Sequence, residues 1–534
     1  MPNVPSAKAT DADSLIKQHE ELLFLRAYPT NPNRLEQADN QLKKIVESVE
    51  RLRKADADLS ALDDPEVSGI AGTSVTSNFS YALVRWLVRR YPPQLSIDWD
   101  WFEEDDRFGA TMPRFLPLLE EDAMVEAHVP YREWLEAATG RKNEVAWIID
   151  RFESLSLTDK QKAELYDSLK LHVTWRFGAR SSRTRMRLPP RKVFFHKEEM
   201  IRRRDVSLVN ELNSPPIPIE RLKGSYGEKV LDLARETSAV RYRELHGFTY
   251  GDPKRVLKAE LGRGVQAFVM GVPPEYRLPL RAYHAAIIFN NGVPVAYFEG
   301  LSLFERMESG FNLYYTFRDG ETAWLYARIL RMMKQLLGVT VISIDPYQVG
   351  HENQEGIESG AFWFYRKLGF RPVKPELMKL TLTEEKKLAH KRDYRSSART
   401  LRRLADGHMI FELAPARTRG AWDQFTARKV GLATQKRMAR EFKSDPEAIR
   451  NASAAYVKRV LNVSTKTWND HEHTALLNLA LPLSMIPDVE RWDDSQKQLA
   501  AQIIRAKAGK DEARYLKLMQ THAALRRALI RFGS

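Results

Sequence analysis

A run of strand-like segments in the middle of the chain, with helical patterns on both sides, constrains the fold most strongly. The segments are rich in β-branched and aromatic residues and lie at Gln266–Gly271, Ala282–Phe289, Val293–Leu303 and Gly310–Phe317. Asn290-Asn291-Gly292 joins two of them, and Asn-Gly favours a tight hairpin turn because it accepts positive φ at little steric cost. The sequence therefore predicts a β-sheet that contains an antiparallel hairpin.

Helices and strands alternate after this hairpin. A helix is expected over residues 321–337, where Leu325, Ile329 and Leu336 share one face and Gly338 follows as a stop signal. The next expected elements are a strand at Val339–Ile344, a helix over 356–368, and strands at Phe370–Val373 and Leu377–Leu382. We therefore expect residues 220–383 to form a mixed α/β core, opened by an amphipathic helix over 226–246.

The flanking segments show helical periodicity. Before the core, helices are expected over residues 13–58, 76–92, 129–139, 143–154 and 159–176, and the Pro-rich stretch 213–218 marks a boundary. After it, they are expected over 386–405, 421–442, 446–461, 471–481, 494–507 and 511–531. The predicted organisation is a mainly helical N-terminal domain (1–210), the α/β core (220–383) and a basic helical C-terminal domain (384–534).

Composition excludes several kinds of chemistry. The 534 residues include no cysteine, so disulfides, thiolate nucleophiles and cysteine-bound zinc or iron–sulfur centres are excluded. The start of the chain does not resemble a signal peptide, and the most apolar stretch, Thr474–Pro487, is shorter than the ~20 apolar residues of a membrane span. We expect a soluble, cytoplasmic protein without a membrane partner.

Positive charge is concentrated after residue 150. The chain has 84 Lys+Arg and 70 Asp+Glu, yet residues 1–150 sum to −10 and the remainder to +24. Basic side chains are densest between Arg176 and Arg204 and again in the helices after residue 384. Such runs can hold the phosphates of nucleic acid or of a nucleotide cofactor. They can equally be solvated faces whose aliphatic stems cover the core.

The stretch Ser359–Pro372, SGAFWFYRKLGFRP, resembles a motif of the GNAT superfamily of acyl-CoA-dependent N-acyltransferases. The family pattern is an aromatic residue and a Tyr, then three intervening residues, then Gly-Phe, and Phe364, Tyr365, Gly369 and Phe370 match it here. The order of elements over residues 220–383 is also similar to that fold. The resemblance implies a GNAT-like mixed sheet, acetyl-CoA or another acyl-CoA as co-substrate, an amine acceptor and no metal.

The resemblance also implies a catalytic acid. Two parallel strands of this family splay apart and hold the thioester between them, here expected at 310–317 and 339–344. Tyr365 would lie beside the sulfur and protonate the departing CoA thiolate. The alternative is structural, because Phe362 to Tyr365 form one aromatic run and some of these rings must pack in the core.

Acyl transfer also benefits from a base, because an ammonium group must lose a proton before it attacks. Glu299, in the strand 293–303, is the first candidate, directly or through a water. Asp345, at the end of the strand 339–344, is the second candidate.

The turn before the helix 321–337 is the expected cofactor site. A helix start presents unpaired N–H groups and a positive dipole end, which suits the pyrophosphate of CoA. Glu321 departs from the family pattern, which has a Gly at this position. The family often has an Asn before the Tyr helix that touches the cofactor arm, and the resemblance implies this role for Asn353. The candidate cofactor-binding residues are Tyr315, Phe317, Arg318, Gly320, Glu321, Thr322, Ala323 and Asn353. The alternative is an ordinary turn capped by Asp319.

Two further readings complete the sequence analysis. His471 and His473 do not share a helix face, so we expect no metal site there. A rival function is a non-catalytic GNAT-like scaffold that binds nucleic acid or a protein partner through its basic helices.

Overall fold

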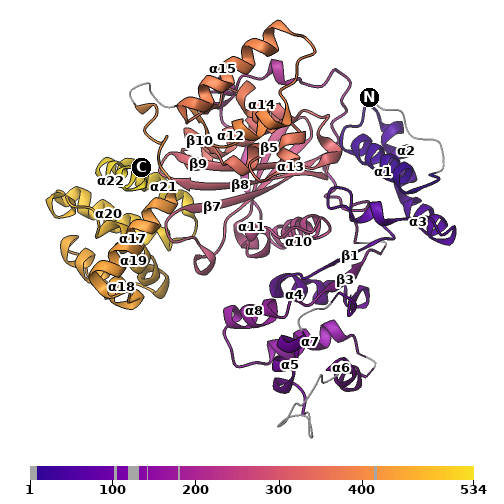
Figure 1. Ribbon diagram of the computed structural model, residues 1–534, viewed down its shortest axis with the longest axis horizontal. Helices are drawn as coiled ribbons and strands as arrows, with labels where there is room; N and C mark the ends of the chain where they lie inside the picture. The colour runs from indigo at the N-terminus through magenta and orange to yellow at the C-terminus, as the bar shows by residue number, and fades with distance from the viewer. Residues whose placement is uncertain (1–8, 102–104, 118–130, 141, 179–180, 414–417) are drawn as a thin grey trace.

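A mixed β-sheet forms the centre of the computed structural model, which describes residues 9–101, 105–117, 131–140, 142–178, 181–413 and 418–534 (Figure 1). The strands are ordered β11-β12-β10-β9-β8-β7-β6-β5-β4. Neighbours are antiparallel except β9 and β10, which are parallel. The strands span Ile219–Arg221 (β4), Leu257–Gly262 (β5), Val265–Met270 (β6), Ala282–Asn290 (β7), Val293–Leu303 (β8), Arg306–Leu313 (β9), Val341–Ile344 (β10), Arg371–Pro372 (β11) and Met409–Glu412 (β12).

The predicted hairpin is confirmed as β7 and β8. Asn290 pairs with Val293, and the turn residues Asn291 and Gly292 have φ values of 47° and 80°. Gly292 is also required by its surroundings, since a Cβ there would lie 2.1 Å from the Leu188 carbonyl oxygen. The glycine is therefore required both by the backbone conformation of the turn and by the close approach of the chain at Leu188.

Helices cover both faces of the sheet (Figure 1). On one face, α10 (Tyr226–Ala239) and α11 (His246–Thr249) pack with Phe268, Ile287 and Phe289. On the other face, α12 (Thr322–Leu337) and α21 (Glu512–Thr521) pack with Ala286 and Ile288. Consecutive residues of β7 therefore alternate between two apolar layers, as the pleat of a strand requires.

The N-terminal part of the chain combines helices with a small sheet of order β1-β3-β2. The strands span Ser74–Ser77 (β1), Leu95–Ile97 (β2) and Val173–Arg176 (β3). The helices span Ala12–Ala27 (α1), Pro32–Lys43 (α2), Ile45–Lys54 (α3), Tyr81–Arg90 (α4), Asp105–Thr111 (α5), Tyr131–Thr139 (α6), Glu144–Glu153 (α7), Asp159–Ser168 (α8) and Leu208–Leu212 (α9). The expected helix over 159–176 is wrong after Ser168, because Val173–Arg176 pairs with β1 and β2.

A buried cluster of charged residues ties helix α1 to the central sheet. The Glu20 carboxylate lies 2.5 Å from the Arg183 guanidinium and accepts hydrogen bonds from His19 and from the Thr316 hydroxyl. Thr316 belongs to the 3₁₀ turn Tyr315–Phe317, which connects β9 to α12. The N-terminal helix therefore anchors the turn that precedes the expected cofactor site.

The C-terminal part is helical. Its helices span Ala427–Phe442 (α17), Pro446–Val460 (α18), Asp470–Leu483 (α19), Asp494–Lys507 (α20), Glu512–Thr521 (α21) and Ala523–Gly533 (α22). Among the described residues, no helix combines the length and the apolar character that a membrane crossing needs.

Two strand predictions are wrong. The expected strand 310–317 is β9 at Arg306–Leu313, and residues 315–317 form the 3₁₀ turn instead. The expected strand Leu377–Leu382 lies inside helix α15 (Pro375–His390), where Pro375 suits the first helical turn and the buried Leu377, Thr381 and Glu384 follow helical spacing. The strand that joins the sheet is β12, which follows α16 (Ala398–Leu404) and lies beyond residue 383.

Candidate active site

The two parallel strands at the centre of the sheet separate along their length. β9 and β10 pair only as Arg306 with Val341, Met307 with Ile342, and Glu308 with Ser343. β9 continues to Leu313, whereas β10 ends at Ile344 and the chain turns into the 3₁₀ helix Pro346–Val349. Within the described part of the chain, the edge of β9 after Glu308 therefore has no strand partner on the β10 side.

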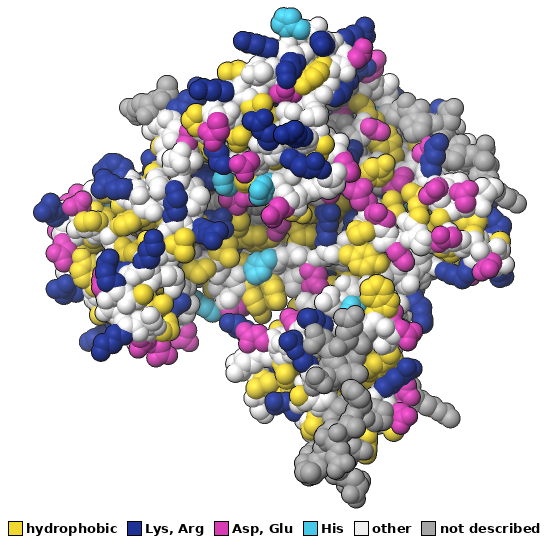
Figure 2. Space-filling model, in the orientation of Figure 1, with side chains coloured by type: hydrophobic (Ala, Val, Ile, Leu, Met, Phe, Trp, Pro, Cys, Tyr) yellow, Lys and Arg dark blue, Asp and Glu magenta, His cyan; other side chains and the backbone are white. Residues whose placement is uncertain are grey.

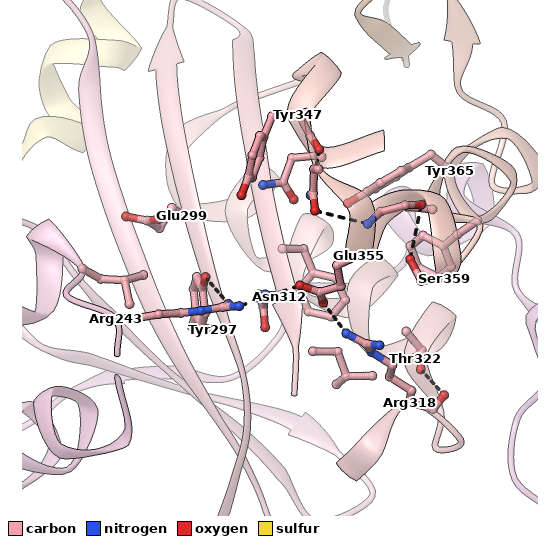
Figure 3. Close-up of a pocket in the computed structure, with 18 of the residues that line it drawn as sticks. Arg243, Tyr297, Glu299, Asn312, Arg318, Thr322, Tyr347, Glu355, Ser359 and Tyr365 are labelled. Carbon is pink, nitrogen blue, oxygen red and sulfur yellow. Dashed lines mark hydrogen bonds and ion pairs between the residues drawn. The ribbon is translucent and has the colours of Figure 1, made fainter. Parts of the chain in front are cut away.

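A cavity of about 610 Å³ opens where the strands separate. Its walls come from β8, from the unpaired part of β9, from the segment after α10, and from the helices α13 (Gln354–Glu358) and α14 (Ala361–Lys367). Figure 3 shows side chains of these elements converging on it. The lining side chains that carry the following argument are Arg243, Tyr297, Glu299, Asn312, Arg318, Glu355 and Tyr365.

Tyr365 forms one wall of this cavity. It is 3% exposed, and its ring packs edge-on against Tyr326 and Phe370, which fixes the orientation of the phenol. Figure 3 shows the side chain reaching from α14 toward the cavity. The hydroxyl is protonated at neutral pH, as any phenol with an ordinary pKa is, and burial raises the pKa of Tyr365 further, which makes it a weaker acid than an exposed phenol. Tyr365 therefore belongs both to the aromatic core and to the cavity wall.

Glu299 lies on the sheet side of the same cavity (Figure 3). It stands on β8 opposite Gly310 of β9, and its carboxylate accepts a hydrogen bond from the Tyr283 hydroxyl. Burial raises the pKa of Glu299, while the Tyr283 hydrogen bond lowers it. No cation pairs with this carboxylate among the described residues, which suits a group that gains and loses a proton.

Three charged groups form a network across the cavity. The Glu355 carboxylate contacts the Arg318 guanidinium and lies 3.8 Å from that of Arg243, which also donates to the Tyr297 hydroxyl at 3.2 Å. The Arg318 guanidinium also lies 3.5 Å from the carboxylate of Glu66. The sequence analysis did not identify Arg243, Tyr297 or Glu355 as site residues. These three residues lie far apart in the chain, so no local sequence pattern indicates that their side chains come close together.

The turn before α12 is closely packed. A Cβ on Gly320 would lie 2.4 Å from the Tyr28 hydroxyl, and the Glu321 backbone hydrogen-bonds to that hydroxyl. The Glu321 side chain is 2% exposed and forms a two-point ion pair with Arg263, at 2.8 and 2.6 Å. Glu321 also accepts from the Ile201 N–H at 2.9 Å. Its negative charge is therefore neutralised inside the protein and does not face a ligand.

A larger groove of about 1180 Å³ lies at the start of α12. It includes Gly320, Thr322 and Ala323. Its charged lining residues are the basic Lys197, Arg202, Arg203 and Arg318 and the acidic Glu20, Glu21, Glu198, Glu199 and Asp319. The groove and the first cavity share three lining residues, Arg318, Thr322 and Phe364. An extended ligand could therefore place an anionic end at the helix start and its other end near Tyr365.

The remaining residues that were predicted to bind the cofactor lie partly in the groove, partly in the cavity and partly in the core. Tyr315 lines the groove and is 51% exposed, whereas Phe317 is buried in the core. The Thr322 hydroxyl donates to the Arg318 carbonyl at 3.1 Å. Asn353 lines the cavity, caps α13 through the Gly356 N–H and donates to the Tyr347 carbonyl at 2.9 Å.

Asp345 is not part of this site. Its carboxylate caps the 3₁₀ helix after β10 by accepting from the Tyr347 N–H at 2.9 Å. It lines a separate cavity with Arg306, Glu308 and His408. The structure therefore brings Glu299, and not Asp345, into one cavity with Tyr365.

Neither a group of metal-binding side chains among the described residues nor a match to a known protein identifies the function of the site. The described residues contain no group of three or more His, Asp or Glu side chains arranged to hold a metal ion. Comparison with protein-family models, with curated proteins and with solved structures gave no match.

Proposed function

We propose that this protein is an acyl-CoA-dependent N-acyltransferase with a GNAT-like core. The observation that carries the proposal is the separation of β9 from β10 around a cavity that contains both Tyr365 and Glu299. The thioester would lie in the gap, beside the unpaired edge of β9, whose free amide groups suit the pantetheine arm and the thioester carbonyl.

The residues divide the chemistry as follows. Glu299 accepts the proton that the acceptor ammonium must lose, directly or through a water. The free amine then attacks the thioester carbonyl, so a C–N bond forms and the C–S bond breaks. Tyr365 donates its proton to the departing thiolate, and the fixed orientation of its ring holds the hydroxyl at the reacting atoms. The nitrogen loses its second proton as the amide forms, and this proton restores the Tyr365 hydroxyl, so the products are the amide, the free CoA thiol and the proton held by Glu299.

The groove at the start of α12 would hold the anionic part of acyl-CoA. The helix dipole favours negative charge there, and Lys197 and Arg203 add positive charge at its walls, whereas Arg202 pairs with Glu199 at 3.0 Å. Arg318 stands between groove and cavity and is 33% exposed in its side chain. A ligand phosphate would compete with Glu355 for this guanidinium.

A second function has one specific observation in its favour. Lys391, Arg392, Arg399 and Arg403 are exposed around the end of α15 and on α16, with no ion pair among the described residues. Such a surface could follow a phosphate backbone, and the GNAT-like core would then serve only as a scaffold.

Ligand titration separates the two functions. The melting temperature should rise with acetyl-CoA, because a ligand that binds only the folded state stabilises it. Duplex and single-stranded nucleic acid, each at two salt concentrations, form the second arm. Steeply salt-dependent binding of nucleic acid without any effect of acetyl-CoA would favour the scaffold and reject the transferase.

A further inference from the structure

A second cavity, of about 590 Å³, lies on the opposite face of the central sheet from Glu299. It is bounded by β5, β6 and β7, by the end of α12 and by α21, which lies alongside β7 (Figure 1). Its apolar walls are formed by Leu257, Val269, Leu336, Leu337 and Leu518. The volume is in the range of about 300–1,000 Å³ that is typical of sites for small organic ligands.

His284 is a buried polar group in this cavity. Its neighbour in β7, Tyr283, points to the other face and bonds to Glu299, so the pleat directs His284 toward α21. The residue is 7% exposed, and its ring forms no hydrogen bond among the described residues. A buried ring nitrogen without a partner is costly unless a ligand satisfies it.

Unpaired cations surround the cavity. Arg221, Arg514 and Lys517 line it, are exposed, and form no ion pair among the described residues. Both lining carboxylates have partners within the protein, because Asp511 caps α21 and the Glu512 carboxylate lies 2.5 Å from the Lys507 ammonium group. The surroundings of the cavity therefore attract an anion.

Two further arginines have a structural role. Arg277 donates to the carbonyl of Lys507 at 2.5 Å and to that of Lys510 at 3.4 Å, and Arg255 contacts the Lys510 carbonyl as well. They hold the turn between α20 and α21 against the sheet. The cavity is thus built by long-range contacts and does not depend on the exposed cations for its shape.

We propose that this cavity binds an amphipathic organic carboxylate. Its carboxylate would lie among Arg221, Arg514 and Lys517, its hydrocarbon body along the leucine-rich walls, and a hydroxyl or carbonyl oxygen at its far end against His284. The site is separate from the candidate active site and does not depend on the acyltransferase proposal.

Calorimetric titration of the full chain with 10-hydroxydecanoate tests this site. We expect saturable binding at one site, about tenfold tighter than the binding of decanoate, which leaves His284 without a partner. Decanol, which lacks the anionic group, should also bind less tightly. Absence of saturable binding of 10-hydroxydecanoate, or equal affinity for all three compounds, would overturn the proposal.

Charge reversal tests the cationic surroundings. The double variant Arg514→Glu/Lys517→Glu should bind 10-hydroxydecanoate about tenfold or more weakly. The matched control is Arg527→Glu/Arg531→Glu, at two exposed positions on α22 that do not line the cavity, and its affinity should be that of the wild type. An unchanged affinity in the double variant, or an equal loss in the control, rejects the anion site.

The proposed contact with His284 is tested by the variant His284→Leu, which should bind decanoate and 10-hydroxydecanoate with equal affinity. Retained preference for the hydroxylated compound would exclude the contact with His284. If this buried substitution prevents folding, Leu336→Trp provides the second test at a partly exposed position. The larger side chain should fill the cavity and abolish binding, whereas unaltered binding would place the ligand elsewhere.

Discussion

At the scale of single residues, the environment gives the two candidate catalytic groups different roles. Burial raises the pKa of both Tyr365 and Glu299. The phenol is protonated at neutral pH without this shift, and the raised pKa makes it a weaker acid, so the proton donor relies on its position beside the thiolate. For the carboxyl it moves the pKa from its ordinary value toward neutrality, where a base is most effective. Removal from water thus makes the carboxylate on β8 a stronger base and the phenol on α14 a weaker acid.

The first prediction concerns the acid. Tyr365→Phe should lower kcat about 100-fold or more, because the thiolate then departs without a proton. The affinity for acetyl-CoA should be nearly unchanged, since the ring and its packing remain. The measurement is a comparison of steady-state turnover with calorimetric CoA affinity.

Tyr347→Phe is the matched control for this substitution. Tyr347 is a second phenol at the same cavity and is 55% exposed. Its loss should leave kcat within a few-fold of the wild type. Comparable turnover in Tyr365→Phe and wild type would show that Tyr365 is only a core aromatic residue.

The second prediction concerns the pH dependence of the base. Glu299 works only when deprotonated, so kcat/KM should fall as the pH decreases through its pKa, which burial raises above the ordinary 4.5. Glu299→Gln should lower the rate and abolish this acidic limb. The check is a pH profile of kcat/KM for both proteins.

Tyr283→Phe gives an independent test of the same assignment. The Tyr283 hydrogen bond lowers the pKa of Glu299, so its removal should raise that pKa further. The acidic limb should consequently move to higher pH while the maximal rate changes little. A limb that stays in place in both variants would mean that another group is the base.

At the scale of elements, sequence reasoning succeeded where local signals decide the structure. The Asn-Gly turn between β7 and β8 and helix α12 with Gly338 after its end appear as predicted. It failed where a distant contact decides. Residues 409–412 form a strand that pairs with β10 on one side and with β11 on the other. Residues 377–382, which were expected to form a strand, belong instead to the helix that begins at Pro375.

The same distinction applies to the candidate site. Tyr365 and Glu299 were identified from a motif and from a strand position, and the structure places both in one cavity. Arg243 and Glu355 were missed, because their meeting depends on how α10 ends and on how α13 folds over β9. No periodicity within either segment indicates that contact.

The third prediction concerns the groove at the start of α12. The double variant Lys197→Glu/Arg202→Glu should weaken CoA binding about tenfold or more, because it replaces positive by negative charge beside the expected phosphates. The rate at saturating acetyl-CoA should change little, since both residues lie away from Tyr365. Calorimetry and steady-state kinetics measure the two effects.

The control for this prediction reverses the same number of charges elsewhere. Lys386→Glu/Lys391→Glu alters exposed positions at the end of α15, outside the groove. Its CoA affinity should match that of the wild type. Equal weakening in both double variants would indicate a general effect of net charge and would remove the groove as the phosphate site.

At the scale of the whole molecule, helix α10 joins the N-terminal region to the central sheet. Asp232 accepts from the Trp86 indole at 2.7 Å and from Arg90 at 2.6 Å, and Glu236 accepts from the Tyr91 hydroxyl at 3.2 Å. The opposite face of α10 packs on β6 and β7 through Val230 and Leu231. Polar contacts on one side and apolar packing on the other therefore set how the two parts of the chain meet.

The fourth prediction concerns the stability of this joint. Glu236 is 4% exposed, and burial raises its pKa to about 8. Below that pH the folded protein keeps the carboxyl protonated, whereas the unfolded chain releases the proton above about 4.5. The folded state thus binds the extra proton, so the free energy of unfolding should decrease as the pH rises from about 4.5 toward 8.

Glu236→Gln should remove this loss, because a neutral amide of the same shape replaces the carboxyl and can still accept from Tyr91. We expect the variant to unfold at a higher temperature than the wild type at pH 8, by a stabilisation on the order of 3 kcal/mol, and at nearly the same temperature at pH 5. Glu228→Gln, at an exposed position of the same helix, should show no such pH-dependent difference. A difference between Glu236→Gln and wild type that is the same at both pH values would mean that the carboxyl does not titrate on folding. In that case the joint between α10 and the N-terminal region would hold an ionised carboxylate, stabilised by Arg90 and Tyr91.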